Sequence, residues 1–130
     1  MSGRPAGPGP VVIVVAHGSR AEQANDAHRH VVSELAGRVA GTVHPAFLEL
    51  AEPSIPDAID AAIAAGAAPV LVLPYFLYPG RHLTRDLPAI VADATQRHPG
   101  HEISLLDLFG ARPGVVDVLA AQVEEALDPT

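Results

Sequence analysis

The chain of 130 residues contains no cysteine and no lysine, and these two absences exclude several kinds of chemistry. Without cysteine there can be no disulfides, thiolate zinc sites, iron–sulfur clusters or cysteine nucleophiles. Without lysine there can be no Walker A loop, whose lysine binds phosphates, and no Schiff-base chemistry. We therefore expect any reaction of this chain to proceed without ATP hydrolysis by the chain itself.

Positive charge and long apolar runs are also scarce. The formal net charge of −7 argues against nucleic acid as a partner, because its phosphates require clustered Lys and Arg. No apolar run approaches the roughly 20 residues that span a bilayer, and residues 1–10 lack the apolar core of a signal peptide. We expect a cytoplasmic protein that binds no membrane, with a flexible lead-in at 1–10 and a single domain at 11–130.

Short apolar runs alternate with longer amphipathic stretches, which predicts an α/β fold, a three-layer sandwich around a four-stranded parallel sheet. Strands are expected at 11–16, 43–50, 69–76 and 102–106. The third helix is expected to begin at about Thr84. The first helix should direct an apolar stripe to the core, namely Ala24, Ala27, Val31, Leu35 and Val39, and the last helix, 113–127, should direct Val116, Leu119, Ala120, Val123 and Leu127. Right-handed crossovers favour the flavodoxin-like strand order 2-1-3-4.

Two histidines follow predicted strands, where open parallel sheets bind their ligands. His17 follows the first strand and His82 lies beyond the third, so the strand order would make them neighbours, with Glu49 at the end of the second strand. A His/His/Glu set suits zinc, cobalt, nickel or ferrous iron. Taken singly, a structural role for His17 at a strand end or for His82 in a loop is an equally good interpretation. Solvated surface positions are expected for the remaining histidines, namely His28, His30, His44, His98 and His101.

Other candidate residues gather near the same sheet edge. A carboxylate such as Glu49 in an apolar strand end is costly unless it is paired or metal-bound. The arginines near this edge are Arg20, Arg81 and Arg85, and guanidinium groups bind carboxylates bidentately. Ser19 can either cap the following helix or donate a hydrogen bond. The aromatic residues, either contacts for a flat ligand or core filling, are Phe47, Tyr75, Phe76, Tyr78 and Phe109.

Three separated segments, 16–20 (AHGSR), 47–56 (FLELAEPSIP) and 73–82 (LPYFLYPGRH), resemble the short CbiX-type sirohydrochlorin chelatases, a class II chelatase family. The resemblance covers essentially 11–127. It implies insertion of cobalt, ferrous iron or nickel into sirohydrochlorin without ATP, as in sirohaem or cobalamin-type biosynthesis. It also implies a homodimer with its cleft at the carboxyl ends of the strands. The divalent metal would be a substrate, and no organic cofactor is expected.

Carried over by motif, His17 and His82 would hold the incoming metal, and Glu49 would assist as ligand or proton acceptor. The residues expected to bind the tetrapyrrole are Ser19, Arg20, Phe47, Tyr75, Phe76, Tyr78, Arg81 and Arg85. One departure is that Arg112-Pro113 stands where many relatives have His-Pro, which leaves a role in substrate carboxylate binding open for this loop.

Two other functions compete with this interpretation. A carrier of tetrapyrrole or metal would bind the same partners without turnover. A metal-dependent hydrolase of small anionic substrates is disfavoured, because the sequence offers neither a second carboxylate cluster nor a G-x-S-x-G nucleophile motif.

Overall fold

The computed structural model describes residues 9–128, apart from the side chain of His82. The lead-in expected at 1–10 therefore lies almost wholly outside the described residues. Within 9–128, no helix has both the length and the apolar composition needed to cross a membrane. The elements in chain order are β1 (Val11–Ala16), α1 (Glu22–Ala36), β2 (Thr42–Phe47), α2 (Ile55–Ala64), β3 (Val70–Pro74), η1 (His82–Asp86), α3 (Leu87–Arg97), β4 (Ile103–Leu105), η2 (Phe109–Ala111) and α4 (Gly114–Leu127).

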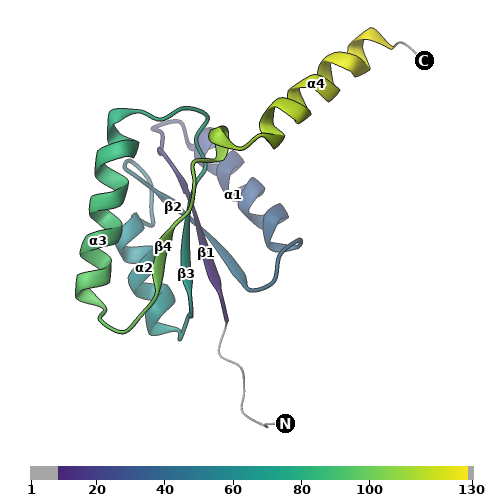
Figure 1. Cartoon of the computed structure of the whole chain (residues 1–130). Helices are drawn as coiled ribbons and strands as arrows, with labels where there is room; N and C mark the ends of the chain where they lie inside the picture. Colours follow the sequence, from purple (N-terminus) through teal and green to yellow (C-terminus); the bar gives the residue numbers. More distant parts are fainter. Residues whose placement is uncertain (1–8, 129–130) are drawn as a thin grey trace, which may run out of the picture.

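The four strands form one parallel sheet in the order β2-β1-β3-β4, which confirms the predicted fold class and strand order (Figure 1). β1 lies between β2 and β3, and its Ile13 and Val15 have no exposed surface. Strands buried on both faces are built from such β-branched residues, because these pack well on a pleated surface.

The two faces of the sheet are covered unequally. α2 and α3 cover one face, which we call the closed face, and their apolar residues form the larger core cluster, including Ile55, Ile59 and Val91. α1 covers part of the other face, which we call the open face. The cluster there is small, consisting of Val14, Val32 and Val43.

The start of α2 illustrates how the closed face is built. The hydroxyl of Ser54 accepts a hydrogen bond from the backbone N–H of Asp57 at 3.2 Å, which satisfies a donor that the first turn of a helix leaves free. Pro56 lies in this first turn, where its missing N–H costs nothing. Ile55 and Ile59 then point into the sheet and are 1% and 0% exposed.

α1 turns a different face to the sheet from the one predicted. Its buried residues are Asn25, His28 and Val32, whereas Val31 is 38% exposed. Val39 lies beyond the end of α1, and Ala24 and Ala27 are exposed as well. Of the predicted stripe only Leu35 is confirmed, since it is half-buried against the open-face cluster. The rest of the stripe is wrong because two polar side chains of α1 find hydrogen-bond partners inside the fold, so polar contacts decide which face is buried. His28, expected at the surface, is 6% exposed.

α4 forms where a helix was predicted but does not pack on the sheet. None of its residues is buried, and it extends away from the rest of the domain (Figure 1). Four residues expected to face inward, Val116, Leu119, Val123 and Leu127, are 67%, 56%, 57% and 77% exposed, and Ala120 is exposed too. The packing prediction is wrong because Arg112 is extended and Pro113 already helical, so the chain does not reverse toward its own sheet.

Candidate functional site

His17 and Glu49 meet at the carboxyl ends of β1 and β2. Backbone pairing continues past both strands, since the N–H of Leu48 donates to the carbonyl of Ala16 at 2.9 Å and the N–H of Glu49 donates to that of His17 at 3.0 Å. This pairing sets the two side chains side by side, with Nε2 of His17 2.8 Å from Oε2 of Glu49. The side chains are 50% and 56% exposed. The structure thus brings these two predicted site residues together.

The close approach of these two loops requires glycine at position 18. Gly18 has φ +98°, and a Cβ there would overlap the carbonyl oxygen of Glu49. The next residue after Glu49, Leu50, also has a positive φ of 66°. Such backbone conformations are uncommon outside glycine and cluster at functional sites.

The side chain of Asn25 anchors the loop between β1 and α1 by two hydrogen bonds. The N–H of Ser19 donates to Oδ1 of Asn25 at 3.0 Å, and Nδ2 of Asn25 donates to the carbonyl of Ser19 at 2.8 Å. Asn25 is only 2% exposed and Ser19 is half-buried, so bulk water competes little for these bonds. The hydroxyl of Ser19 accepts from the N–H of Ala21 at 3.0 Å. Since α1 has no side-chain cap at Ala21, the interpretation of Ser19 as its cap is wrong.

His28 joins α1 to a row of aromatic rings on the open face. Its Nε2 lies 2.9 Å from the carbonyl oxygen of Val14, so that nitrogen carries the proton and donates. Its ring lies edge-on to Phe47 at 5.3 Å and stacks on Tyr75 at 5.9 Å, and Tyr75 lies edge-on to Phe109 at 5.1 Å. Burial lowers the pKa of His28, which keeps the ring neutral near pH 7.

The predicted aromatic residues divide into core and surface. Phe47 is 1% exposed and fills the core, so its ring offers no surface to a ligand. Phe76 is half-buried and packs against the closed-face cluster. Tyr75 and Tyr78 are 38% and 80% exposed.

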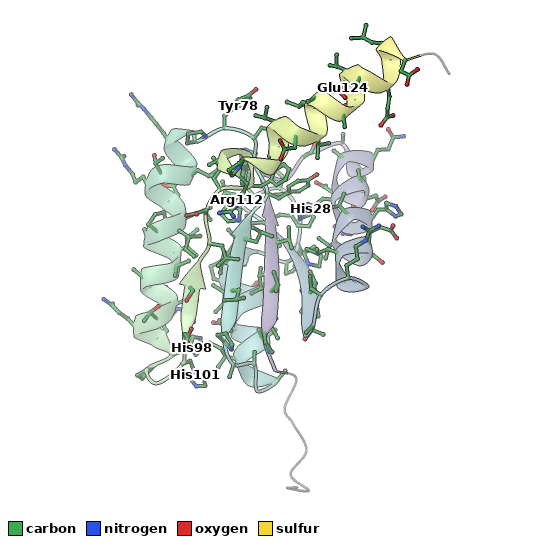
Figure 2. The ribbon with its side chains drawn as sticks, turned by 45° about the vertical axis from the view of Figure 1, so that its right-hand side comes forward. His28, Tyr78, His98, His101, Arg112 and Glu124 are labelled. Carbon is green, nitrogen blue, oxygen red and sulfur yellow. The ribbon has the colours of Figure 1, made fainter. Side chains whose placement is uncertain are left out.

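The histidines at the two ends of the sheet have different partners. Figure 2 shows Tyr78 at the carboxyl end of the sheet and His98 and His101 at the opposite end. His98 is not simply solvated as expected, because its Nε2 lies 2.7 Å from Oδ1 of Asp60 and its side chain is 22% exposed. Hydrogen bonds from His98 and then Arg97 lower the pKa of Asp60. These residues belong to a surface network far from His17.

The connection after β3 ends in a π-helical turn, η1, which begins at His82, two residues before the predicted helix start. The carbonyl of Gly80 accepts from the N–H groups of Leu83 and Thr84, both at 3.0 Å. Single π-turns are rare and occur often at functional sites. The backbone of His82 therefore starts this turn, whereas its side chain lies outside the described part of the structure. The predicted arginines Arg20, Arg81 and Arg85 are all exposed.

A hollow of about 460 Å³ lies beside Glu49 and is lined by Leu48, Glu49, Asp86, Ala89 and Ile90. The end of η1 and the loop after β2 therefore line the same hollow. The sequence motifs do not single out Asp86, and its only signal is its place four residues after His82. Among the side chains that the structure describes, no group of three or more His, Cys, Asp or Glu could hold a metal ion. His17 and Glu49 supply two donors.

The loop that departs from the family pattern lies on the open face. Nη1 of Arg112 is 3.6 Å from Oδ2 of Asp107, and both side chains are well exposed, at 64% and 81%. Figure 2 shows Arg112 above the sheet, near the start of α4.

The CbiX family model matches residues 11–126. The chloroplastic sirohydrochlorin ferrochelatase of Arabidopsis thaliana is 35% identical over 89% of this chain and 52% of its own length. The sirohydrochlorin cobaltochelatase of Methanopyrus kandleri is 29% identical over 89% of this chain and 96% of its own length. The chain spans about half or less of the length of several curated relatives that it matches.

Two solved structures share the fold. A CbiX protein from Marinobacter aquaeolei VT8 superposes with a TM-score of 0.80 at 28% identity, covering 93% of this chain and 99% of its own. The sirohydrochlorin chelatase SirB from Bacillus subtilis subspecies spizizenii, in complex with cobalt, superposes with a TM-score of 0.79 at 27% identity, covering 89% and 50%. With the family model matched over nearly the whole described chain, the protein belongs to the CbiX family.

Proposed function

We propose that this chain inserts a divalent metal, cobalt or ferrous iron, into sirohydrochlorin without ATP. The observation that carries the proposal is the pair formed by His17 and Glu49, 2.8 Å apart at the carboxyl edge of a CbiX-family sheet. Relatives named as sirohydrochlorin ferrochelatases and cobaltochelatases support the choice of substrate. The proposed unit is residues 11–130 acting as one chelatase domain.

Insertion requires two events that the pair can serve. Two pyrrole N–H protons must leave the macrocycle, and a partly desolvated metal must arrive at the four ring nitrogens. In the proposal, the Glu49 carboxylate accepts a proton while the His17 imidazole positions the metal. His82 is the second metal ligand in this proposal, because it begins η1, whose last residue, Asp86, lines the same hollow as Glu49. Two imidazoles bind loosely enough to release the metal to the macrocycle.

The tetrapyrrole would lie across the same edge. Arg20, Arg81 and Arg85 are exposed there and form no ion pair with any side chain that the structure describes, so they are available for substrate carboxylates. Tyr75 and Tyr78 supply accessible rings for the flat macrocycle. Ser19 and Phe76 would contribute as neighbours of these groups, whereas Phe47 acts from the core.

We also propose that two copies form a homodimer. The chain is about half as long as the Arabidopsis relative and matches 50% of SirB, so a second copy would supply the other half of such an architecture. A cytoplasmic location and the lack of an organic cofactor stay predictions. Cell fractionation and the absorbance spectrum of the purified protein would test them.

The test is an anaerobic insertion assay that follows the absorbance of sirohydrochlorin with Co²⁺, Fe²⁺ or Ni²⁺ in turn. We expect His17→Ala and Glu49→Gln each to lower the rate by about 100-fold or more, because each removes an acid–base or ligand group. His82→Ala tests the second proposed ligand in the same way. His30→Ala, an exposed histidine of α1, is the matched control and should keep the wild-type rate.

Turnover separates the enzyme from the carrier. Many metallated products per chain would support the proposal. One tetrapyrrole bound per site, with no metallated product above the uncatalysed rate, would instead identify a carrier. Wild-type rates in both His17→Ala and Glu49→Gln would contradict the assignment of the site.

A further inference from the structure

Arg112 is the only lysine or arginine after β4, and no carboxylate of the described chain holds it closely. Its Nη1 lies 3.6 Å from Oδ2 of Asp107, which is longer than a hydrogen bond. By contrast, Nη1 of Arg29 lies 2.7 and 2.8 Å from carboxylate oxygens of Glu22 and Asp26. The Arg112 side chain is also 64% exposed. Its guanidinium is therefore open to an anion that comes from outside the domain.

The backbone of Arg112 is fixed although its side chain is exposed. Its N–H donates to the carbonyl of Phe109 at 3.0 Å, which closes the turn of η2. Pro113 follows, and a residue before proline is confined to extended conformations, in agreement with φ −77° and ψ 137° at Arg112. The starting point of this long side chain is thus fixed, which lowers the entropy cost of binding a ligand with it.

η2 is joined in turn to the segment that follows β3. The N–H of Gly110 donates to the carbonyl of Phe76 at 2.8 Å. A Cβ at Gly110 would overlap the backbone of Leu77, so only glycine allows the two segments to approach so closely. Figure 2 shows Arg112 toward the carboxyl end of the sheet. Arg112 therefore belongs to the edge at which His17 lies.

Phe109 places Arg112 beside the exposed ring of Tyr75. Side chains three residues apart in a 3₁₀ turn lie on the same side, and Phe109 and Arg112 line the same two hollows, of about 320 and 490 Å³. Phe109 lies edge-on to Tyr75 at 5.1 Å, and His28 stacks on Tyr75 at 5.9 Å. These contacts hold the Tyr75 ring and leave it 38% exposed. A flat anionic ligand suits this arrangement, because its face can lie on the ring while its carboxylate binds the guanidinium.

The β4 side of the edge depends on Arg112 for positive charge. Arg20 follows β1, and Arg81 and Arg85 lie in the connection after β3, whereas the segment from β4 to α4 has Asp107 and Arg112 as its charged residues. Sirohydrochlorin carries carboxylates around its whole ring, so a macrocycle lying across the edge brings anions to this side as well. Asp107 alone would repel them, and Arg112 offsets that repulsion.

We propose that Arg112 binds a carboxylate at the rim of the tetrapyrrole whose face lies on Tyr75. Arg112 is thereby a specificity-determining residue of substrate binding. Asp107 pairs loosely with the guanidinium in the free protein and yields it to the substrate carboxylate. This inference rests on the proposed function, because it takes sirohydrochlorin as the substrate.

The first test separates KM from kcat in the anaerobic insertion assay of the full chain. Arg112→Gln should raise KM for sirohydrochlorin about 10-fold, because a charge-assisted bidentate contact is lost. It should leave kcat and the KM for Co²⁺ nearly unchanged, because the contact is made equally before and during the reaction. Arg112→Lys should restore part of the loss, since it keeps the charge but not the planar fork. Arg38→Gln, at an exposed arginine just past the end of α1, is the matched control.

The second test measures binding without metal, from the fluorescence of sirohydrochlorin during titration with protein. Arg112→Gln should raise Kd about 10-fold and make it less sensitive to salt, because one exposed charge pair is lost. Asp107→Asn should leave Kd equal or lower, since it removes a competing anion. Thermal melts of both variants should match the wild type, because the two side chains are 64% and 81% exposed.

A wild-type KM and Kd in Arg112→Gln would overturn the inference. A fall in kcat at unchanged KM would overturn it too, because Arg112 would then act in the chemical step. Equal losses of affinity in Arg112→Gln and Asp107→Asn, with lowered melting temperatures, would show that the ion pair merely supports the loop. If the wild type binds sirohydrochlorin without metallating it, the proposed activity fails, and the Kd of Arg112→Gln still decides this inference. A wild type that does not bind sirohydrochlorin would overturn both.

Discussion

The closed and open faces belong to the same strands, but the helices that cover them bury different kinds of side chain. On the closed face, α2 and α3 bury apolar side chains such as Ile55 and Ile59 with almost no polar atoms among them. On the open face, α1 buries Asn25 and His28, and the sheet is only partly covered. The first face supplies most of the burial energy, and the second holds the loop of His17.

This difference indicates that the closed face supplies most of the apolar burial, whereas the polar contacts of the open face position the loop of His17. Apolar burial on the closed face depends on area and can be lost only at a large cost in the free energy of unfolding. The hydrogen bonds of Asn25 contribute less to that free energy, but they position the His17 loop. Substitutions on the two faces should therefore change different observables.

The largest effect on stability is expected for Ile59→Ala on the closed face. Ile59 has no exposed surface, so the substitution leaves a cavity and should lower the free energy of unfolding by about 2–5 kcal/mol. Urea unfolding measures this loss. Val31→Ala on α1, at a side chain 38% exposed, is the control and should stay within about 0.5 kcal/mol. A fall in kcat of the folded Ile59→Ala protein would argue against the separation of the two faces.

Asn25→Ala on the open face should cost less stability than Ile59→Ala but should also lower kcat. It leaves the N–H and carbonyl of Ser19 without their partner and costs about 1–3 kcal/mol in stability. Because the loop that carries His17 loses its anchor, kcat for insertion should fall by about 10-fold or more. Gln23→Ala, an exposed residue of the same helix, is the control. A loss of stability equal to that of Ile59→Ala with normal kcat would show that Asn25 serves the core alone.

The smallest effect concerns pH and His28. Burial lowers the folded-state pKa of His28 below the ordinary 6.5, so the unfolded chain binds this proton more readily than the folded one. The contribution of His28 to stability is thus fully present above pH 6.5 and is lost as the pH falls from 6.5 toward the folded-state pKa. Thermal melts across this range should therefore show a falling melting temperature.

A matched pair of variants isolates this contribution. In His28→Gln the amide can still donate to the carbonyl of Val14, but nothing titrates there, so the decline in melting temperature below pH 6.5 should be shallower than in the wild type. His30→Gln, at an exposed position of the same helix, should keep the wild-type slope. Equal slopes in the two variants would contradict the assignment of the pH dependence to His28.

The sheet and the pair at its edge could be predicted from the sequence because their signals are local. Apolar runs such as Val11–Ala16 mark strands whatever surrounds them, and parallel pairing brings the residues after neighbouring strands together. The meeting of His17 with Glu49 follows from these two facts. The strand order needed only the handedness of the crossovers.

The errors arise where the decisive partner lies elsewhere in the chain or outside it. The apolar stripe of α1 was misplaced because periodicity does not anticipate that Asn25 binds the Ser19 backbone or that His28 donates to Val14. The apolar residues of α4 do lie on a helix, as predicted. No pattern within 114–127 shows whether this helix packs on its own sheet. The direction of α4 depends on the anchoring of η2, which is a long-range contact.

The half-exposure of His17 and Glu49 has a kinetic consequence for the proposed reaction. At 50% and 56% exposure, both side chains touch bulk water in the folded state, so a hydrated cation could reach them without the opening of any lid. Loading of the site would then be paced by how fast the ion sheds its own water molecules. Ions with slow water exchange, such as nickel, would load later than cobalt or iron at equal concentration.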